Sequence, residues 1–186
     1  MIYVVQEAPK AEPITLADAR AHLNEPPTQH DATIESAIVA ARQHVELWCD
    51  RALMLQTWLA VCDAFPATIE LRGGRVKEVV SVQYVDADGA LQTLSESAYY
   101  ADTIRDPGRL VPVSSWPATA NRPNAVRVTY KVGYDDATKI PAPLIAAIKL
   151  IVGDLFENRE SQVVGQSYSE SETVSRLLTP YRRVVL

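Results

Sequence analysis

The stretch Ile140-Pro-Ala-Pro-Leu-Ile-Ala-Ala-Ile-Lys-Leu-Ile-Val-Gly-Asp-Leu-Phe-Glu-Asn-Arg-Glu160 decides the fold, because its pattern is that of one long amphipathic helix. Pro143 suits the first helical position, where a backbone N–H would have no partner within the helix. From Pro143 to Glu160 such a helix is about 27 Å long, which is enough for the spine of a small domain. The apolar residues recur at helical spacing and predict a buried stripe: Leu144, Ile145, Ile148, Ile151, Val152, Leu155 and Phe156.

A second long helix precedes this one in the sequence. Asp31 or Thr33 can cap its N-terminus, and the pattern continues to about Arg51. Its apolar face is predicted to comprise Ile34, Ile38, Ala41, Val45 and Trp48, while Glu35, Arg42, Gln43 and Glu46 are predicted to fall on other faces.

Two shorter helices are predicted near the ends of the chain. Thr15 followed by Asp18 is typical of a capping box, which predicts a helix over residues 16–23. A last short helix is predicted over residues 172–178, before Pro180 ends it.

The middle of the chain changes to the two-residue period of β-strands, beginning at Leu55. The connections between the predicted strands are too short for crossover helices, so we expect a mainly antiparallel sheet. The fold class is therefore α+β, with a small helical bundle of the N-terminal helices plus the long C-terminal helix, and an inserted β module. Strands are predicted over residues 55–62, 68–71, 76–85, 90–93, 99–104, 109–113 and 125–134.

We expect a single domain over residues 1–186, because this length supports one sizeable core. Its predicted parts are N-terminal helices over residues 14–54, a β-rich module over 55–139, the long helix over 140–160, and a mobile loop with a C-terminal tail over 161–186.

Composition excludes several classes of protein. No apolar run reaches the ~18 residues of a membrane span, so no membrane partner is expected. The net charge is −5, and its negative excess is N-terminal, with 8 acidic and 4 basic residues in positions 1–54. Tight nucleic-acid binding needs clustered basic residues, and the only such feature is the pair Arg182-Arg183. The first residues lack the pattern of a secretory signal, so Cys49 and Cys62 are expected to be reduced in the cytosol.

The acidic clusters are better explained as turns than as sites. Asp86-Ala-Asp-Gly89 begins like a calcium loop but lacks the downstream glutamate, so a hairpin turn is favoured. Asp135-Asp136 could hold a metal or share a proton, although a solvated loop is the preferred interpretation. His22, His30 and His44 show no metal-ligand spacing. We therefore predict no catalytic, cofactor-binding or metal site, no cofactor, and no enzymatic activity.

The order of segments across residues 14–182 resembles the head-tail connector, or adaptor, proteins of tailed bacteriophages, in particular the subgroup with a β-rich insertion. The segments that carry the resemblance are Ile14–Leu23, Asp31–Trp58, Ser115-Trp116-Pro117, Asn124–Tyr130, Val132-Gly133-Tyr134, Phe156–Glu160 and Leu178–Arg182.

This resemblance implies a viral structural protein that forms a ring beneath the portal of the phage head. The ring would be a dodecamer on the portal, and the isolated protein could be a monomer. Its other partners would be head-completion or tail proteins, and double-stranded DNA would pass through the channel without sequence-specific binding. The location implied is the head-tail interface of the virion, after assembly in the cytoplasm of the bacterial host. A net acidic chain suits such passage, since each added basic contact to phosphate strengthens binding.

The C-terminal tail is the candidate portal-docking segment, because a basic pair is followed by three apolar residues that could order by strand addition. A frayed terminus is the alternative. The candidate docking residues are Pro180, Tyr181, Arg182, Arg183, Val184, Val185 and Leu186.

Two other classes of function stay open at this point. One is a small metal-dependent hydrolase or nuclease that uses Asp135, Asp136 and one histidine. The other is a soluble peptide-binding module that uses an exposed edge of the sheet.

Overall fold

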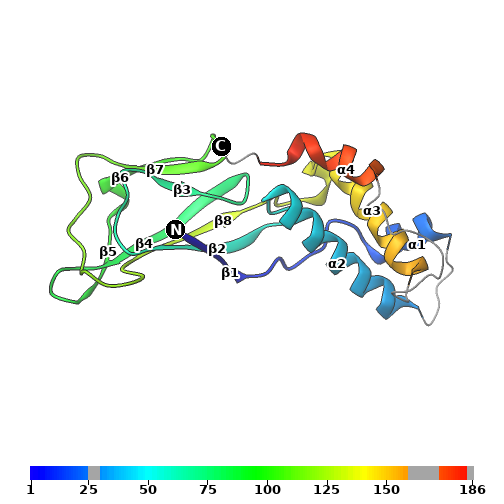
Figure 1. The fold of residues 1–186 in the computed structure, drawn as a ribbon, viewed down its shortest axis with the longest axis horizontal. Helices are drawn as coiled ribbons and strands as arrows, with labels where there is room; N and C mark the ends of the chain where they lie inside the picture. Colours follow the sequence, from blue (N-terminus) through cyan, green and yellow to red (C-terminus); the bar gives the residue numbers. More distant parts are fainter. Residues whose placement is uncertain (25–29, 159–171, 184–186) are drawn as a thin grey trace. The chain divides into compact units, whose positions relative to one another are not determined.

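The computed structural model describes residues 1–24, 30–158 and 172–183. The chain forms two compact units (Figure 1): a β unit of Met1–Lys10 and Met54–Tyr134, and a helical unit of Ala11–Leu53 and Asp135–Leu186. The predicted α+β class, with a β module inserted between helices, is confirmed. The prediction of a single domain over residues 1–186 stays a prediction. The predicted mobile loop over 161–171 lies outside the described residues.

The β unit contains two antiparallel sheets. The larger sheet has the strand order β1-β2-β8-β4-β5, and the smaller has the order β3-β7-β6. A short 3₁₀ helix, η1 (Glu96–Ala98), connects the two sheets between β5 and β6. The strands are β1 (Ile2–Glu7), β2 (Gln56–Cys62), β3 (Ile69–Leu71), β4 (Val76–Val85), β5 (Leu91–Thr93), β6 (Tyr99–Asp102), β7 (Gly108–Pro112) and β8 (Val126–Val132).

The core of the β unit lies between these two sheets. Strand β8 is central in the larger sheet, and it alternates as the sequence predicts, with Arg127 exposed between buried neighbours. Tyr130 is fully buried, and its hydroxyl donates a hydrogen bond of 3.0 Å to the Arg72 carbonyl. A Cβ added to Gly108 on β7 would lie 2.8 Å from Val76 Cγ2 on β4, so the sheets approach each other closely there. Other buried core residues include Ala60, Ile69, Leu71, Val82, Leu110, Val126, Val128 and Val132.

Strand β1 was not predicted from the sequence. It pairs with β2 from Ile2 opposite Val61 to Glu7 opposite Thr57, and it forms one edge of the larger sheet. All of its residues except Tyr3 are exposed. The run therefore lacks the inward and outward alternation that marks a half-buried strand, and pairing with distant residues places it in the sheet.

The helical unit packs α2 (Asp31–Cys49) against α3 (Ala142–Glu157), with the shorter α1 (Leu16–Leu23) and α4 (Glu172–Leu178) against them (Figure 1). Two 3₁₀ helices, η2 (Ala137–Lys139) and η3 (Thr179–Tyr181), precede α3 and follow α4. In the described parts of the chain, no helix is both long and apolar enough to cross a membrane. Both predicted stripes supply the core through Ile34, Ile38, Ala41 and Val45 of α2, and Leu144, Ile148 and Val152 of α3.

Three details of the predicted helices were wrong. Neither Asp31 nor Thr33 caps α2, because the helix begins at Asp31, and the Asp31 carboxylate accepts hydrogen bonds from the Arg20 guanidinium of α1. Helix α3 begins at Ala142, so Pro143 is its second residue. Leu155, predicted to be in the buried stripe, is 39% exposed.

Arg42 was also predicted to lie away from the core, yet it is buried with only 6% of its surface exposed. Its Nε donates to Glu12 at 2.8 Å, and its Nη1 donates to Glu46 at 2.7 Å. The second oxygen of Glu46 accepts the Leu53 backbone N–H at 2.9 Å. Burial is tolerated because the guanidinium is paired on both sides, and this network ties α2 to the segments before and after it.

The predicted capping box of α1 is present. The Thr15 hydroxyl accepts the Asp18 N–H at 3.1 Å, and the Asp18 carboxylate accepts the Thr15 N–H at 3.0 Å. The hydrogen bonds from the Thr15 side chain and backbone lower the pKa of Asp18.

This lowered pKa predicts a pH dependence of α1. Because the Asp18 pKa is lower in the folded state, the cap stabilises the helix above the ordinary aspartate pKa of about 3.9, and the stabilisation is lost as pH falls through the folded value. We expect the NMR chemical shifts of the α1 amides to move toward random-coil values as the cap protonates. The Asp18→Asn variant should lack this titration. The same titration in the variant would contradict the assignment to Asp18.

Candidate assembly surfaces

Two of the seven predicted docking residues, Arg182 and Arg183, contact the C-terminal end of α2, and we call residues 180–183 the tail anchor. The Arg183 backbone N–H donates to the Cys49 carbonyl at 3.3 Å, and its guanidinium pairs with Asp50 at 3.3 Å. The Arg182 guanidinium lies 5.3 Å from the centre of the Trp48 ring, a cation–π arrangement. Of the other predicted docking residues, Val184, Val185 and Leu186 lie outside the described residues.

The tail anchor presents both charge and apolar surface. Pro180 and Arg182 are exposed, and the Arg182 backbone is extended, with φ −69° and ψ 129°. Beneath it, Cys49 is a buried free thiol whose pKa is raised by burial. Cys62 is also free, and the prediction that both cysteines are reduced in the cytosol stays a prediction.

The acidic clusters form turns, as predicted. The Asp86 carboxylate accepts a hydrogen bond from the Gln92 side chain and the N–H groups of Ala90 and Asp88, and these hydrogen bonds, the Gln92 one foremost, lower the pKa of Asp86. Asp136 caps η2 by accepting the Thr138 N–H at 2.8 Å, and the same contact lowers the pKa of Asp136. Both side chains are thus occupied with local backbone.

The predicted histidines are on or beside helices. His22 is exposed on α1, His30 directly precedes α2, and His44 stacks on Trp48 with ring centres 6.3 Å apart. Across residues 1–24, 30–158 and 172–183, no group of three His, Cys, Asp or Glu side chains could hold a metal ion.

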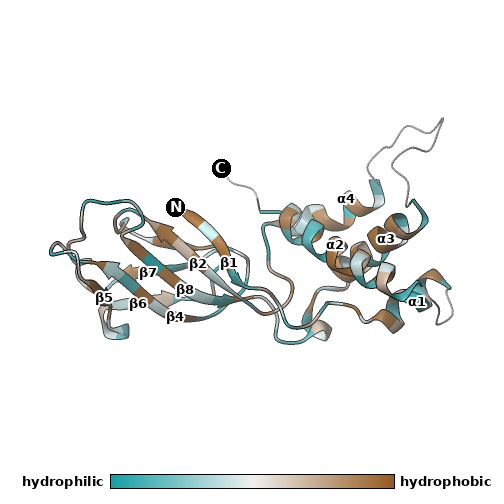
Figure 2. Ribbon diagram, turned by 90° about the horizontal axis from the view of Figure 1, so that it is seen from below, coloured by the Kyte–Doolittle hydropathy of each residue, from teal (hydrophilic) through white to brown (hydrophobic). Residues whose placement is uncertain are grey.

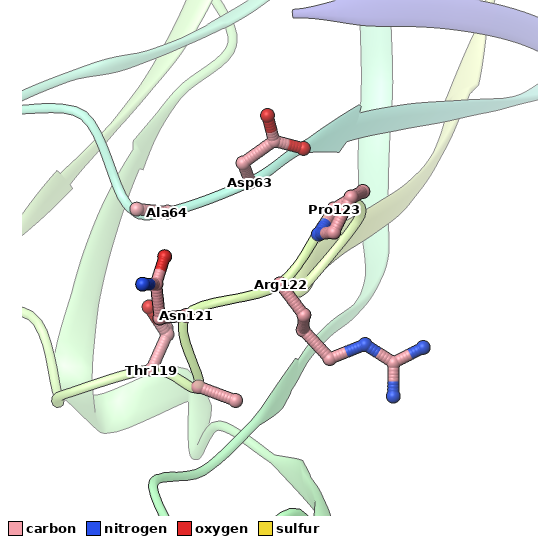
Figure 3. A pocket seen from close by; sticks show the side chains of 7 residues that line it. Asp63, Ala64, Thr119, Asn121, Arg122 and Pro123 are labelled. Carbon is pink, nitrogen blue, oxygen red and sulfur yellow. The ribbon is translucent and has the colours of Figure 1, made fainter.

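A pocket of about 470 Å³ lies at one end of the β unit, between the loop after β2 and the loop before β8 (Figure 3). Asp63 is occupied there, because its carboxylate accepts the Asn124 N–H at 2.8 Å. The Arg122 side chain extends away from Asp63 and Asn121. The polar groups therefore do not converge on one point, and the pocket has the character of a gap between loops. Its lining is Asp63, Ala64, Thr119, Ala120, Asn121, Arg122 and Pro123.

An apolar surface that the sequence did not predict lies on the outer face of the larger sheet, where Figure 2 shows the apolar colouring of β1. Ile2 and Val4 are 62% and 49% exposed, and their cross-strand partners on β2, Val61 and Leu59, are half-buried. Residues two apart on a strand share a face, so the four side chains are contiguous. We call Ile2, Val4, Leu59 and Val61 the β1–β2 patch. Its signals in the sequence were the apolar run at residues 2–5 and the alternation that includes Leu59 and Val61.

The outer face changes character beyond β2. The next strand places Arg127 beside Val61 and Thr129 beside Leu59, and β4 continues with Gln83 and Ser81. Beyond β2 this face is therefore mainly polar, with Val80 at the β4 bulge, 49% exposed, as an apolar exception.

A second exposed apolar surface lies on α2. Leu47 is 85% exposed and Val39 is 36% exposed. Spacings of three and four residues place them on one face with Ser36, Ala40 and Gln43, which are also exposed. We call these five residues the α2 stripe. It lies opposite the face that packs on α3, so it is not needed for the core of the helical unit.

The complete chain shares its fold with chains in solved structures of gene transfer agent (GTA) particles. Each alignment covers 100% of this chain and 97% of the other. The neck of an empty GTA particle computed with C6 symmetry aligns with a TM-score of 0.83 at 18% identity, and the virion of the native particle aligns with 0.82 at 18%. The neck of the native particle computed with C12 symmetry aligns with 0.80 at 19%. At these identities, the likeness establishes the fold. No protein-family model and no curated protein matches the sequence.

Proposed function

We propose that this chain is a structural protein of a phage-like virion and forms a ring at the neck. The ring would join the portal of the head to head-completion or tail proteins, and double-stranded DNA would pass through it. The observation that carries the proposal is the correspondence of the whole fold, both units included, with neck chains of a GTA particle. The C6 and C12 symmetries of those neck structures support a ring of copies.

The surfaces of the chain are consistent with this role. A ring held by head-to-tail contacts needs two unlike faces on each subunit, and the β1–β2 patch and the α2 stripe are two such surfaces. The net charge of −5 suits a channel that DNA must pass, because a basic lining would retain phosphates.

The experiment that tests the proposal combines the purified chain with particles of its cognate portal. We expect the two proteins to co-sediment, and electron microscopy to show an added ring on the portal. If the folded chain and the folded portal do not co-sediment at any of the salt concentrations tested, the proposal is overturned.

The tail anchor predicts which residues support this docking. Replacing Arg182 and Arg183 with alanine removes the exposed Arg182 charge and the Arg183 charge, whose side chain is 18% exposed, together with the cation–π contact and the ion pair that position the tail. We expect portal binding to weaken about tenfold or more, which corresponds to about 1.4 kcal/mol. Quantitative sedimentation with labelled chain measures the change.

The matched control is Arg105→Ala, which removes an exposed charge from the β unit. It should bind the portal like the unmodified chain. Circular dichroism should show that the double variant and the control both retain the fold. Equal portal binding by the unmodified chain, the double variant and the control would show that docking uses another surface.

A further inference from the structure

We infer that the β1–β2 patch of one copy receives the α2 stripe of a second copy. This inference rests on the proposed ring and names the contact between its subunits. It begins from an unprotected sheet edge: in the described part of the chain, β1 pairs with β2 and with no other strand.

Over residues 2–5 the β1 edge lacks the usual features that prevent association, and its one irregularity of register lies between Val5 and Glu7, at the end of the strand. Protein edges are commonly blocked by lysine, proline or inward-pointing charge, yet Ile2, Val4 and Val5 are 62%, 49% and 49% exposed. The residues of this edge that could oppose contact, Gln6 and Glu7, lie at its end, and the Glu7 carboxylate accepts the Thr57 hydroxyl at 3.0 Å. A contiguous group of exposed apolar side chains of this kind is typical of an interaction surface.

The patch extends beyond the edge onto β2, and this determines the kind of occupant. A single added strand would pair with β1 but leave Leu59 and Val61 uncovered. An α-helix about 10 Å wide covers two strands spaced 4.8 Å apart. The occupant that fits is therefore a helix with an apolar face.

The chain itself supplies such a helix. The α2 stripe presents a leucine with 85% exposure, and the small residues Ala40 and Ser36 lie about two and three turns before it on the same face, where they allow close approach to a flat sheet. The borders carry opposite charges, because Arg127 lies beside Val61 in the sheet and Glu35 lies beside Val39 on the helix. Since the patch and the stripe differ, their contact is heterologous and propagates from copy to copy, as a ring requires.

Substitutions test the contact on the assembled protein. Val4→Lys places a charge in the patch, and Leu47→Lys places one in the stripe, both at exposed positions where lysine is compatible with the fold. We expect each to reduce ring formation on portal particles at least tenfold. The controls are Thr93→Lys on the opposite edge strand, β5, and Ala17→Lys on α1, both exposed and expected to assemble normally.

Cross-linking then identifies the partner surface. In full-length chain that also carries Cys62→Ser, so that no half-exposed native thiol competes, and that is assembled on portal particles, a short bis-maleimide should link Val4→Cys copies to Leu47→Cys copies only when the two variants are mixed. The double variant should give a ladder of linked subunits. As a negative control, Thr93→Cys copies mixed with Leu47→Cys copies should form no cross-link between the two introduced cysteines.

The outcomes separate this inference from the proposed function. Normal rings from both lysine variants, or links within Val4→Cys copies alone, would overturn the inference and leave the ring intact. A defect in Val4→Lys with normal assembly of Leu47→Lys would likewise overturn it, because the occupant would not be the α2 stripe. Absence of rings from the unmodified chain would overturn the proposed function and this contact together.

Discussion

Replacing Gly133 with alanine is expected to destabilise the β unit by at least about 4 kcal/mol. Gly133 follows β8 and has φ +107°, a conformation that favours glycine. An added Cβ would lie 2.3 Å from the Met54 carbonyl oxygen and 2.7 Å from its carbonyl carbon. These are backbone atoms, so no side-chain rotation relieves the clash.

The surrounding backbone hydrogen bonds would be lost together. The Gly133 N–H donates to Arg75 at 3.0 Å, and the Leu55 N–H donates to Tyr134 at 2.9 Å. Moving Met54 away from an added methyl group would pull the start of β2 away from the end of β8. We therefore expect amides of β2 and β8 to lose hydrogen-exchange protection, a measurement that reports the β unit separately from the helical unit.

Gly89→Ala is the matched control. Gly89 also has positive φ, +86°, but an added Cβ there meets nothing within 4 Å. Its cost should be the backbone strain alone, about 1–2 kcal/mol. Similar losses of stability in the two variants would show that the close approach at Met54 is not important.

The second large effect is expected from Arg42→Met. This change preserves much of the buried volume but leaves the Glu12 and Glu46 carboxylates without the guanidinium they share. Removing one member of a buried charge network costs about 3–5 kcal/mol. Urea unfolding followed by hydrogen exchange at α2 amides would measure the loss in the helical unit.

Two comparisons test the explanation. Arg176→Met breaks an ion pair with Glu172 whose side chains are 74% and 78% exposed, and it should cost less than about 0.5 kcal/mol. Adding Glu12→Gln and Glu46→Gln to Arg42→Met should recover part of the loss, since no unpaired charge remains. If the neutralised triple variant is less stable than Arg42→Met, the cost does not arise from unpaired carboxylates.

Local sequence signals predicted many of the elements. The capping box at Thr15 and Asp18 set the start of α1, the strand pattern of residues 76–85 gave the bounds of β4, and the short helix predicted before Pro180 over residues 172–178 matches α4. These signals succeed because capping, turn chemistry and side-chain alternation act between residues that are close in sequence.

The assembly surfaces were less predictable. The basic pair and apolar end of the tail identified a docking candidate, but the contacts of Arg182 with Trp48 and of Arg183 with Asp50 join residues more than 130 positions apart. The patch at Ile2 and Val4 exists only because β1 pairs with β2. Neither the tail contacts nor the pairing of β1 with β2 can be recognised from residues that are close together in the sequence.

By itself, the sequence determined the α+β class, the two amphipathic helices, the antiparallel strands and the turns at Asp86 and Asp136. Only the tertiary structure decided which strands share a sheet, that β1 forms an open edge, and that Arg42 is buried between two carboxylates. The physical reason is the range of the interactions. Hydrogen bonds and periodicity within an element depend on neighbouring residues, whereas sheet order, edge exposure and charge burial depend on which distant segments meet.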